Sequence, residues 1–227
     1  MSPDAEQFSN WLQFDESAQF QSETYEYSVR RPLYAASAIL TRRYLSPDRR
    51  LLECRASARY PIRKKKEFEI RAETDAKGCL VFQEETDLTT GKRRIWRMES
   101  ADRLSLEGGH SFTTHNTVQS VIGLIFAITD LLSSAHSIAG AATMAVVGKQ
   151  VWALRMLPRD RNTTDIHVEV APLEPRKDEV SIADANWSSA YQLLVEWDQR
   201  ARVIRAISVA LPIIGRVKVQ LLKFDRK

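Results

Sequence analysis

Strict alternation between apolar and polar side chains is the feature that most constrains this chain. The cleanest run covers residues 52–60, where Leu, Cys, Ala, Ala and Tyr alternate with Glu, Arg, Ser and Arg. A period of two places the two sets of side chains on opposite faces of an extended strand. Similar runs occur at residues 25–29, 68–73, 96–99, 166–170 and 191–197. The pattern predicts antiparallel strands that are wet on one face and covered on the other.

One segment of the chain departs from this pattern. Residues 104–148 contain no Lys or Arg, their only acids are Glu107 and Asp130, and their apolar density peaks over residues 121–128. A membrane-spanning helix needs about 20 apolar residues, and Asp130 interrupts this run. We therefore interpret the segment as a buried core helix over residues 116–134, with Asn116 as its N-cap.

The 227 residues show no internal repeat and no shift in composition, so we expect one domain over residues 1–227. The fold class predicted is mainly β (α+β), a curved antiparallel sheet or half-open barrel of about ten strands that wraps the apolar helix. The expected order is an N-terminal amphipathic helix over residues 1–21, a first meander over 23–106, the buried helix over 116–134 and a second antiparallel segment over 142–224.

The order of these elements also occurs in a known family. Residues 23–29, 50–58, 66–70 and 91–96 form the meander, residues 120–126 the helix, and residues 211–219 the closing segment. This order is similar to that of a family of exported bacterial proteins of unknown function, and the shape resembles the half-barrels of lipoprotein carriers. The resemblance covers about residues 23–224 and implies a hydrophobic-ligand cavity without implying a reaction. We expect two differences from that family, because no signal-peptide pattern opens the sequence and an additional helix is predicted at residues 1–21.

The formal net charge of +4 names no partner by itself. Residues 42–66 hold ten Lys or Arg against two acids, which fits the solvent faces of two strands and a hairpin tip. Arg63, Lys64, Lys65 and Lys66 could instead contact an anionic membrane surface or a partner protein. Nucleic acid is disfavoured because Tyr60 and Phe68 fall on the opposite face from the charges. No secretory signal opens the sequence, so we expect a cytoplasmic location, or a periplasmic one for a mature form.

Candidate catalytic groups are few. Asp130 is either turned to the surface at the helix end or buried beside a polar partner, and His115 or His136 is the candidate mate if it is buried. His110 and His115 are too weak a pair to predict a metal site, and we expect no metal and no cofactor. Cys54 falls on the apolar face of its strand, and a disulfide with Cys79 would require neighbouring strands. No nucleophile or phosphate-loop motif occurs.

These observations favour a binder or carrier of a lipid-like or polycyclic apolar molecule, held between the curved sheet and the helix. The alternative is a cofactor-independent cyclase or isomerase that uses the same cavity, with Asp130 and His115 as catalytic residues. His110 and Arg94 are expected to orient the ligand at the cavity mouth. The residues expected to line the cavity are Trp96, Met98, Phe126, Trp152, Tyr191 and Trp197.

Overall fold

The computed structural model describes residues 22–31, 34–60, 63–114, 116–133, 142–157, 165–173, 178–211 and 215–227. The helix expected over residues 1–21 lies outside these ranges. In the described part of the chain, all sixteen strands belong to one sheet, accompanied by one α-helix and two short 3-10 turns.

The first half of the sheet is a meander of eight strands. These are β1 (Ser22–Arg31), β2 (Tyr34–Ser46), β3 (Arg49–Tyr60), β4 (Arg63–Asp75), β5 (Leu80–Asp87), β6 (Lys92–Ser100), β7 (Arg103–Leu106) and β8 (Ser111–Thr114). A short strand β9 (Val118–Ser120) leads into the helix α2 (Val121–Ser133).

The second half contains β10 (Ala142–Val147), β11 (Gln150–Met156), β12 (Asp165–Leu173), β13 (Glu179–Val180), β14 (Tyr191–Asp198), β15 (Val203–Leu211) and β16 (Gly215–Arg226). The turns η1 (Ile182–Asp184) and η2 (Trp187–Ser189) connect β13 to β14. The strand order is β13-β8-β7-β6-β5-β4-β3-β2-β1-β16-β15-β14-β12-β11-β10-β9, so β16 joins the two halves by pairing with β1. The sheet is open, with β13 and β9 at its edges, and it is mixed because β8–β13 and β9–β10 are parallel pairs.

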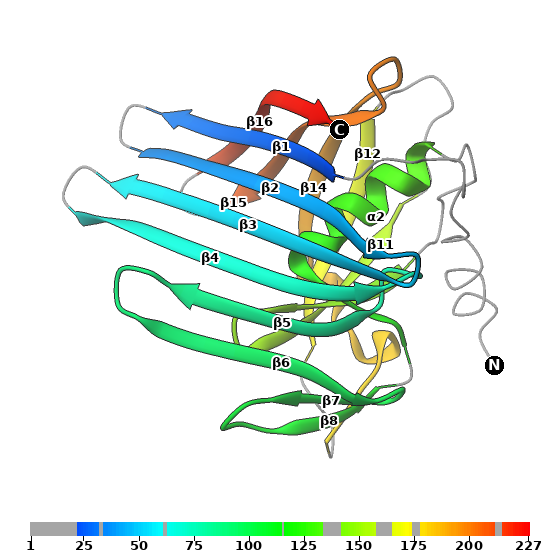
Figure 1. The fold of residues 1–227 in the computed structure, drawn as a ribbon. Coiled ribbons are helices and arrows are strands. Elements are labelled where there is room, and N and C mark those ends of the chain that lie inside the picture. Colours follow the sequence, from blue (N-terminus) through cyan, green and yellow to red (C-terminus); the bar gives the residue numbers. More distant parts are fainter. Residues whose placement is uncertain are drawn as a thin grey trace.

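The helix α2 lies between two parts of this sheet. Figure 1 shows it behind β1–β3 and in front of β11, β12 and β14. Ile122 and Phe126 pack in one apolar cluster with Leu40 and Leu52, whereas Leu124 and Ile128 pack in a second cluster on the far layer with residues such as Leu154 and Val168. A helix that is apolar all round has to be covered on opposite sides, and the sheet covers it in this way.

The prediction of about ten strands is wrong, because several strands give no periodic signal. Strands β7, β8, β9 and β13 contain only two to four residues each. The thirteen-residue β2 was missed because alanines and a charged residue, Arg42, occupy the positions that face inward. Strand β10, in contrast, runs over residues 142–147 as predicted.

The predicted start of the helix is also wrong. Residues 118–120 pair in parallel with β10, and the helix begins only at Val121. Ser120, and not Asn116, caps it, because Ser120 Oγ accepts a hydrogen bond from the backbone N–H of Ile122 at 3.2 Å. Asn116 Oδ1 instead accepts from the backbone N–H of Ile182 at 3.1 Å, which holds the η1 turn.

The face of the sheet that meets α2 is called the inner face below. Even-numbered residues of β2, β3 and β4 pair with one another in the register and belong to this face. The end of the sheet where β1 meets β2, β3 meets β4 and β15 meets β16 is called the hairpin end. The opposite end, marked on the inner face by Glu23, Arg42 and Arg50, is called the charged end. In Figure 1 the strands β1–β4 extend to the left beyond α2, toward the hairpin end.

Candidate functional site

Four charged side chains form an ion network that connects the helix α2 to strands β1, β2 and β16. Glu23 on β1 accepts hydrogen bonds from Arg42 Nε on β2 at 2.9 Å and from Arg226 Nε on β16 at 2.7 Å. Arg42 also donates to both oxygens of Asp130 on α2, at 2.5 and 3.0 Å. The side chains of Glu23 and Arg42 are 2% and 4% exposed. Because buried charges need partners, this ion network links β1, β2, β16 and α2.

The surroundings of Arg42 keep it charged. Burial opposes the positive charge, but Asp130 and Glu23 outweigh burial and raise the pKa of the guanidinium. The ring of Tyr44 lies 5.7 Å from the guanidinium carbon of Arg42 and 5.6 Å from that of Arg50. Burial lowers the pKa of Arg50. The charged end is therefore an electrostatic junction between sheet and helix.

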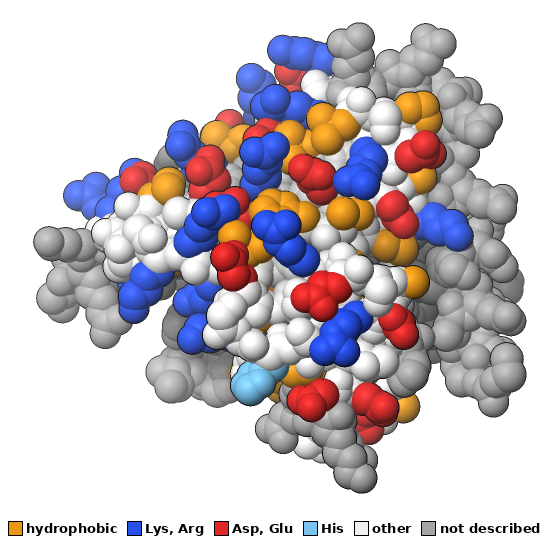
Figure 2. Space-filling view, turned by 60° about the horizontal axis from the view of Figure 1, so that its bottom comes forward, with side chains coloured by type: hydrophobic (Ala, Val, Ile, Leu, Met, Phe, Trp, Pro, Cys, Tyr) orange, Lys and Arg blue, Asp and Glu red, His pale blue; other side chains and the backbone are white. Residues whose placement is uncertain are grey.

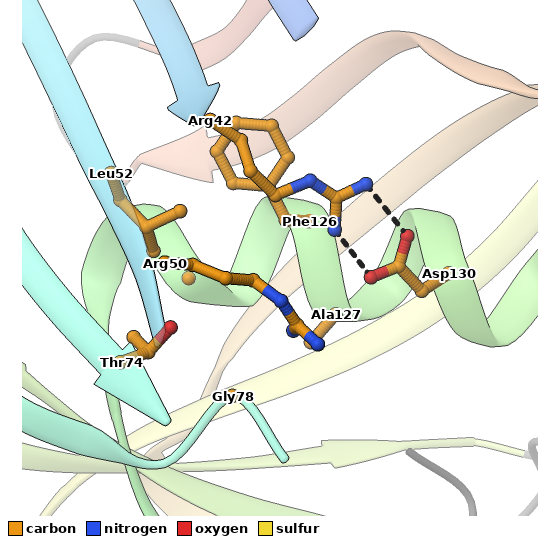
Figure 3. Close-up of a pocket in the computed structure, with 9 residues that line it drawn as sticks. Arg42, Arg50, Leu52, Thr74, Gly78, Phe126, Ala127 and Asp130 are labelled. Atoms are coloured by element: carbon orange, nitrogen blue, oxygen red, sulfur yellow. Dashed lines mark hydrogen bonds and ion pairs between the residues drawn. The ribbon is translucent and has the colours of Figure 1, made fainter. Parts of the chain in front are cut away.

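A recess of about 20 Å³ adjoins this ion network, beside α2. Figure 3 shows the Arg42 guanidinium facing Asp130 across two hydrogen bonds, with Arg50 lying toward Gly78. This volume is about the room that one water molecule needs, so the recess cannot hold a lipid. Its lining consists of Arg42, Arg50, Leu52, Thr74, Gly78, Gly123, Phe126, Ala127 and Asp130.

A second recess, of about 10 Å³, lies on the other side of α2. It is apolar and smaller still, far below the several hundred Å³ of a typical ligand pocket. The sheet and the helix are therefore closely packed where these two recesses occur. The lining residues are Leu124, Ala127, Ile128, Thr143, Leu154, Met156 and Val168.

The inner face of the first layer becomes progressively uncovered toward the hairpin end. On β4, Ala72 is fully buried, Ile70 is half-buried and Phe68 is 36% exposed. The same change occurs on the two strands that precede it, at positions paired with these residues. The half-buried inner-face residues of β2 and β3 are Ala36, Ala38, Ala56 and Ala58, whereas Leu40, Leu52 and Cys54 nearer the charged end are buried.

The inner face of the second layer shows the same gradient. On β14, Trp197 and Val195 are buried, Leu193 is half-buried and Tyr191 is 39% exposed. Strands β15 and β16 carry further half-buried aliphatic residues in register with them, Ile207, Val209, Val217 and Val219. Apolar inner-face side chains of both layers are thus only partly covered at the hairpin end. We call this set of half-buried and exposed residues the uncovered inner face.

The structure places Asp130 half-buried near the end of α2, with both carboxylate oxygens bound by Arg42. This arrangement combines the two alternatives considered for it, since it is near the helix end and also has a polar partner. A carboxylate held in this way serves the ion pair with Arg42. Its candidate mates, His115 and His136, both lie outside the described residues.

Four of the six residues expected to line a cavity lie in or against the packed core. Trp96 is fully buried, and its Nε1 donates to the carbonyl of Gly148 at 2.9 Å. Phe126 and Trp197 are buried as well, and Met98 is half-buried against the core. These side chains are therefore largely occupied by packing within the protein.

The remaining predicted residues do not gather at one place in the structure. Trp152 and Tyr191 form a ring pair with centroids 6.0 Å apart, and Tyr191 belongs to the uncovered inner face. Arg94 on β6 lies 3.7 Å from the carboxylate of Glu85. His110 is exposed in the turn between β7 and β8. These positions do not converge on one site.

The two cysteines are free thiols. Cys54 is buried on β3 as its place in the alternation predicts, and Cys79 lies before β5. Burial raises the pKa of each thiol to about 11, so both are protonated and unreactive near neutral pH.

Most of the basic side chains described on the strands lie close to an acidic side chain. Arg55 lies near Glu69, Arg49 near Glu73 and Arg43 near Glu53, in each case across neighbouring strands. Figure 2 shows Lys and Arg interspersed with Asp and Glu on the face that it presents. A surface that binds a nucleic-acid backbone would instead gather one sign of charge.

Two kinds of feature are absent from the described part of the chain. None of its helices combines the length and the apolar composition that crossing a membrane would require. Within it, no three or more His, Cys, Asp or Glu side chains are grouped so as to hold a metal ion.

Three residues that build the ion network with Asp130 were not predicted from the sequence: Glu23, Arg42 and Arg226. A signal for two of them is present in the alternation. Glu23 shares the inward register of Tyr25, and Arg42 shares that of Leu40. A charged residue in an apolar register indicates a buried ion pair when a second strand or helix supplies the opposite charge.

Comparison with known proteins supports the fold. No protein-family model and no curated protein matches the sequence. The structure is similar to the crystal structure of a beta-barrel-like protein of a domain of unknown function, DUF1849, from Brucella abortus, with a TM-score of 0.50 and 9% sequence identity over 92% of this chain and 98% of that chain. The expected resemblance is thus confirmed as far as a beta-barrel-like fold of unknown function.

Proposed function

We propose that this protein binds or carries a lipid-like apolar molecule on the uncovered inner face at its hairpin end. The observation that carries the proposal is the burial gradient, which occurs in parallel on β2, β3, β4 and β14. Apolar side chains that face inward and remain partly exposed favour an apolar ligand, because covering them removes hydrocarbon surface from water.

The shapes of the side chains support the same assignment. The first layer presents Ala36, Ala38, Ala56 and Ala58, which are the smallest apolar residues, where larger ones such as Leu40 and Leu52 fill the space near the helix. Small side chains leave the backbone of the sheet accessible to a bound hydrocarbon. Each methylene of a ligand buried there would contribute about 0.8 kcal/mol.

In this proposal the ion network fixes the end of the sheet that does not bind the ligand. It holds α2 on the inner face at the charged end, where the recesses of about 20 and 10 Å³ hold no ligand of this size. The ligand would therefore lie beside the helix, toward the hairpin end. This location differs from the residues around Trp96 and Phe126 that the sequence analysis favoured, because those are buried in the core.

The test is to fill the proposed site with a larger side chain. Ala38→Phe adds a ring on the inner face, and Ala35→Phe adds the same ring to the exposed outer face of the same strand. Binding of a fluorescent fatty-acid analogue should weaken at least tenfold in the first variant and less than twofold in the second. Circular dichroism and thermal unfolding of both variants would establish that they fold.

Two results would contradict the proposal. In one, the unmodified protein neither binds the analogue nor carries a lipid into native mass spectrometry. In the other, both variants bind the analogue as well as the unmodified protein does.

A further inference from the structure

Lys66 lies at the rim of the uncovered inner face. Lys66 pairs with Ala58 in the register of β3 and β4, and it has the same inward parity as Phe68 and Ile70. Its neighbour Lys65 has the opposite parity and donates to Glu67 at 2.6 Å. The two adjacent lysines therefore belong to different faces of one strand.

Lys66 has an acidic group in its surroundings, Asp87, but forms no ion pair with it. Within the part of the chain that the structure describes, its ammonium group forms no ion pair, whereas Arg55 and Lys65 close to it both do. The carboxylate of Asp87 is in the surroundings, at the β5 position paired with Phe68. One oxygen of that carboxylate already accepts hydrogen bonds from the backbone N–H groups of Thr89 and Thr90.

An apolar surface with a cation at its rim fits an amphiphile with the opposite charge on its head. The apolar residues Ile70, Phe68 and Ala58 lead from the buried core to Lys66. Along β4, the four steps from Ile70 to Lys66 span about 13 Å at 3.3 Å per residue. A hydrocarbon chain laid along this path would place its head group beside the ammonium of Lys66.

We propose that the ligand is a single-chain amphiphile with an anionic oxygen head group, a carboxylate or a phosphate, and that Lys66 binds this head group. The inference rests on the proposed function and specifies its ligand class. The attraction comes from one partly exposed charge pair, so we expect it to be screened by salt.

Three ligands with the same chain separate the head group from the tail. Decanoate, decyl phosphate and the neutral decanol would be titrated into the full protein below the concentrations at which they form micelles. We expect at least one of the two anions to bind about tenfold more tightly than decanol at low salt. Whichever anion binds more tightly identifies the source as a fatty acid or a phosphate-bearing lipid.

The variants Lys66→Gln and Lys65→Gln form a matched pair. Lys66→Gln should abolish the preference for the anions while leaving decanol binding unchanged, and Lys65→Gln should retain the preference. If all three ligands bind equally to the unmodified protein, or if Lys66→Gln retains the preference, the head-group inference fails and the apolar site survives. If none of the three ligands binds, the proposed function itself fails.

Discussion

The two ends of the inner face use the same strands for different purposes. At the charged end, Arg42 and Glu23 are buried and joined to Asp130, and α2 covers the sheet. At the hairpin end, the side chains on the same faces of the same strands are apolar, small and partly exposed, as Ala36 and Ala58 illustrate. The alternation in the sequence predicts inward-facing side chains at both ends of the strands. Only the contacts in the structure distinguish the end that holds α2 from the end where we propose that a ligand binds.

This contrast teaches where specificity of structure is concentrated. A buried ion network accepts only one arrangement of its strands and helix, because each charge loses its partner in any other. An apolar face tolerates different neighbours, since hydrophobic contact has no preferred direction. The charged end is therefore suited to define the position of α2, and the hairpin end is where we propose that a ligand binds.

The largest expected effect comes from breaking the ion network. Arg42→Met leaves Asp130 without its cation and Glu23 with Arg226 alone, and the loss of one partner from a buried pair costs about 3–5 kcal/mol. Chemical denaturation should show this loss in the free energy of unfolding. Arg43→Met is the matched control, because Arg43 is 57% exposed and its pair with Glu53 contributes about 1 kcal/mol or less. Equal effects of the two substitutions would show that the network does not fasten the fold.

A smaller effect compares truncations at the two ends. Leu52→Ala, at the charged end of β3, removes a side chain that is 2% exposed and should cost about 3 kcal/mol. Phe68→Ala, at the hairpin end of β4, removes a larger side chain that is 36% exposed and should cost about 1 kcal/mol. Thermal and chemical unfolding would measure both values. A cost for Phe68→Ala that matches that of Leu52→Ala would mean that the hairpin end is covered in solution.

The alternation of apolar and polar residues located several of the long strands of the fold correctly. Long strands with large apolar residues, such as residues 52–60 and 191–197, lie within β3 and β14. Short strands carried no such information. Val118–Ser120 continues directly into the helix, and only its parallel pairing with β10, which is distant in sequence, makes it a strand.

The ion network was harder to predict from the sequence than the strands were, because it depends on which strands become neighbours. Glu23 meets Arg226 only because β16 returns to β1, across 203 positions of the chain. Trp96 and Trp197 looked like ligand-lining residues because large aromatic rings serve in cores and in pockets alike. The extent of their burial depends on packing between layers, which no local pattern specifies.

The smallest expected effect concerns an ion network on the outer face. Glu196 accepts hydrogen bonds from Lys218 at 2.5 Å and from Arg205 at 3.1 Å, and the bond from Lys218 is the main cause that lowers the pKa of this carboxyl below 4.5. A lowered pKa in the folded state means that the stabilisation is present above pH 4.5 and is lost as the pH falls through the folded value. Glu196→Gln should therefore reduce the free energy of unfolding at pH 7 by less than about 1 kcal/mol, with the difference disappearing in acid. Urea denaturation between about pH 3 and pH 7, a range that spans the titration of a glutamate, would measure this difference in the free energy of unfolding. A constant difference across that range would assign the effect of Glu196 to packing and not to its charge.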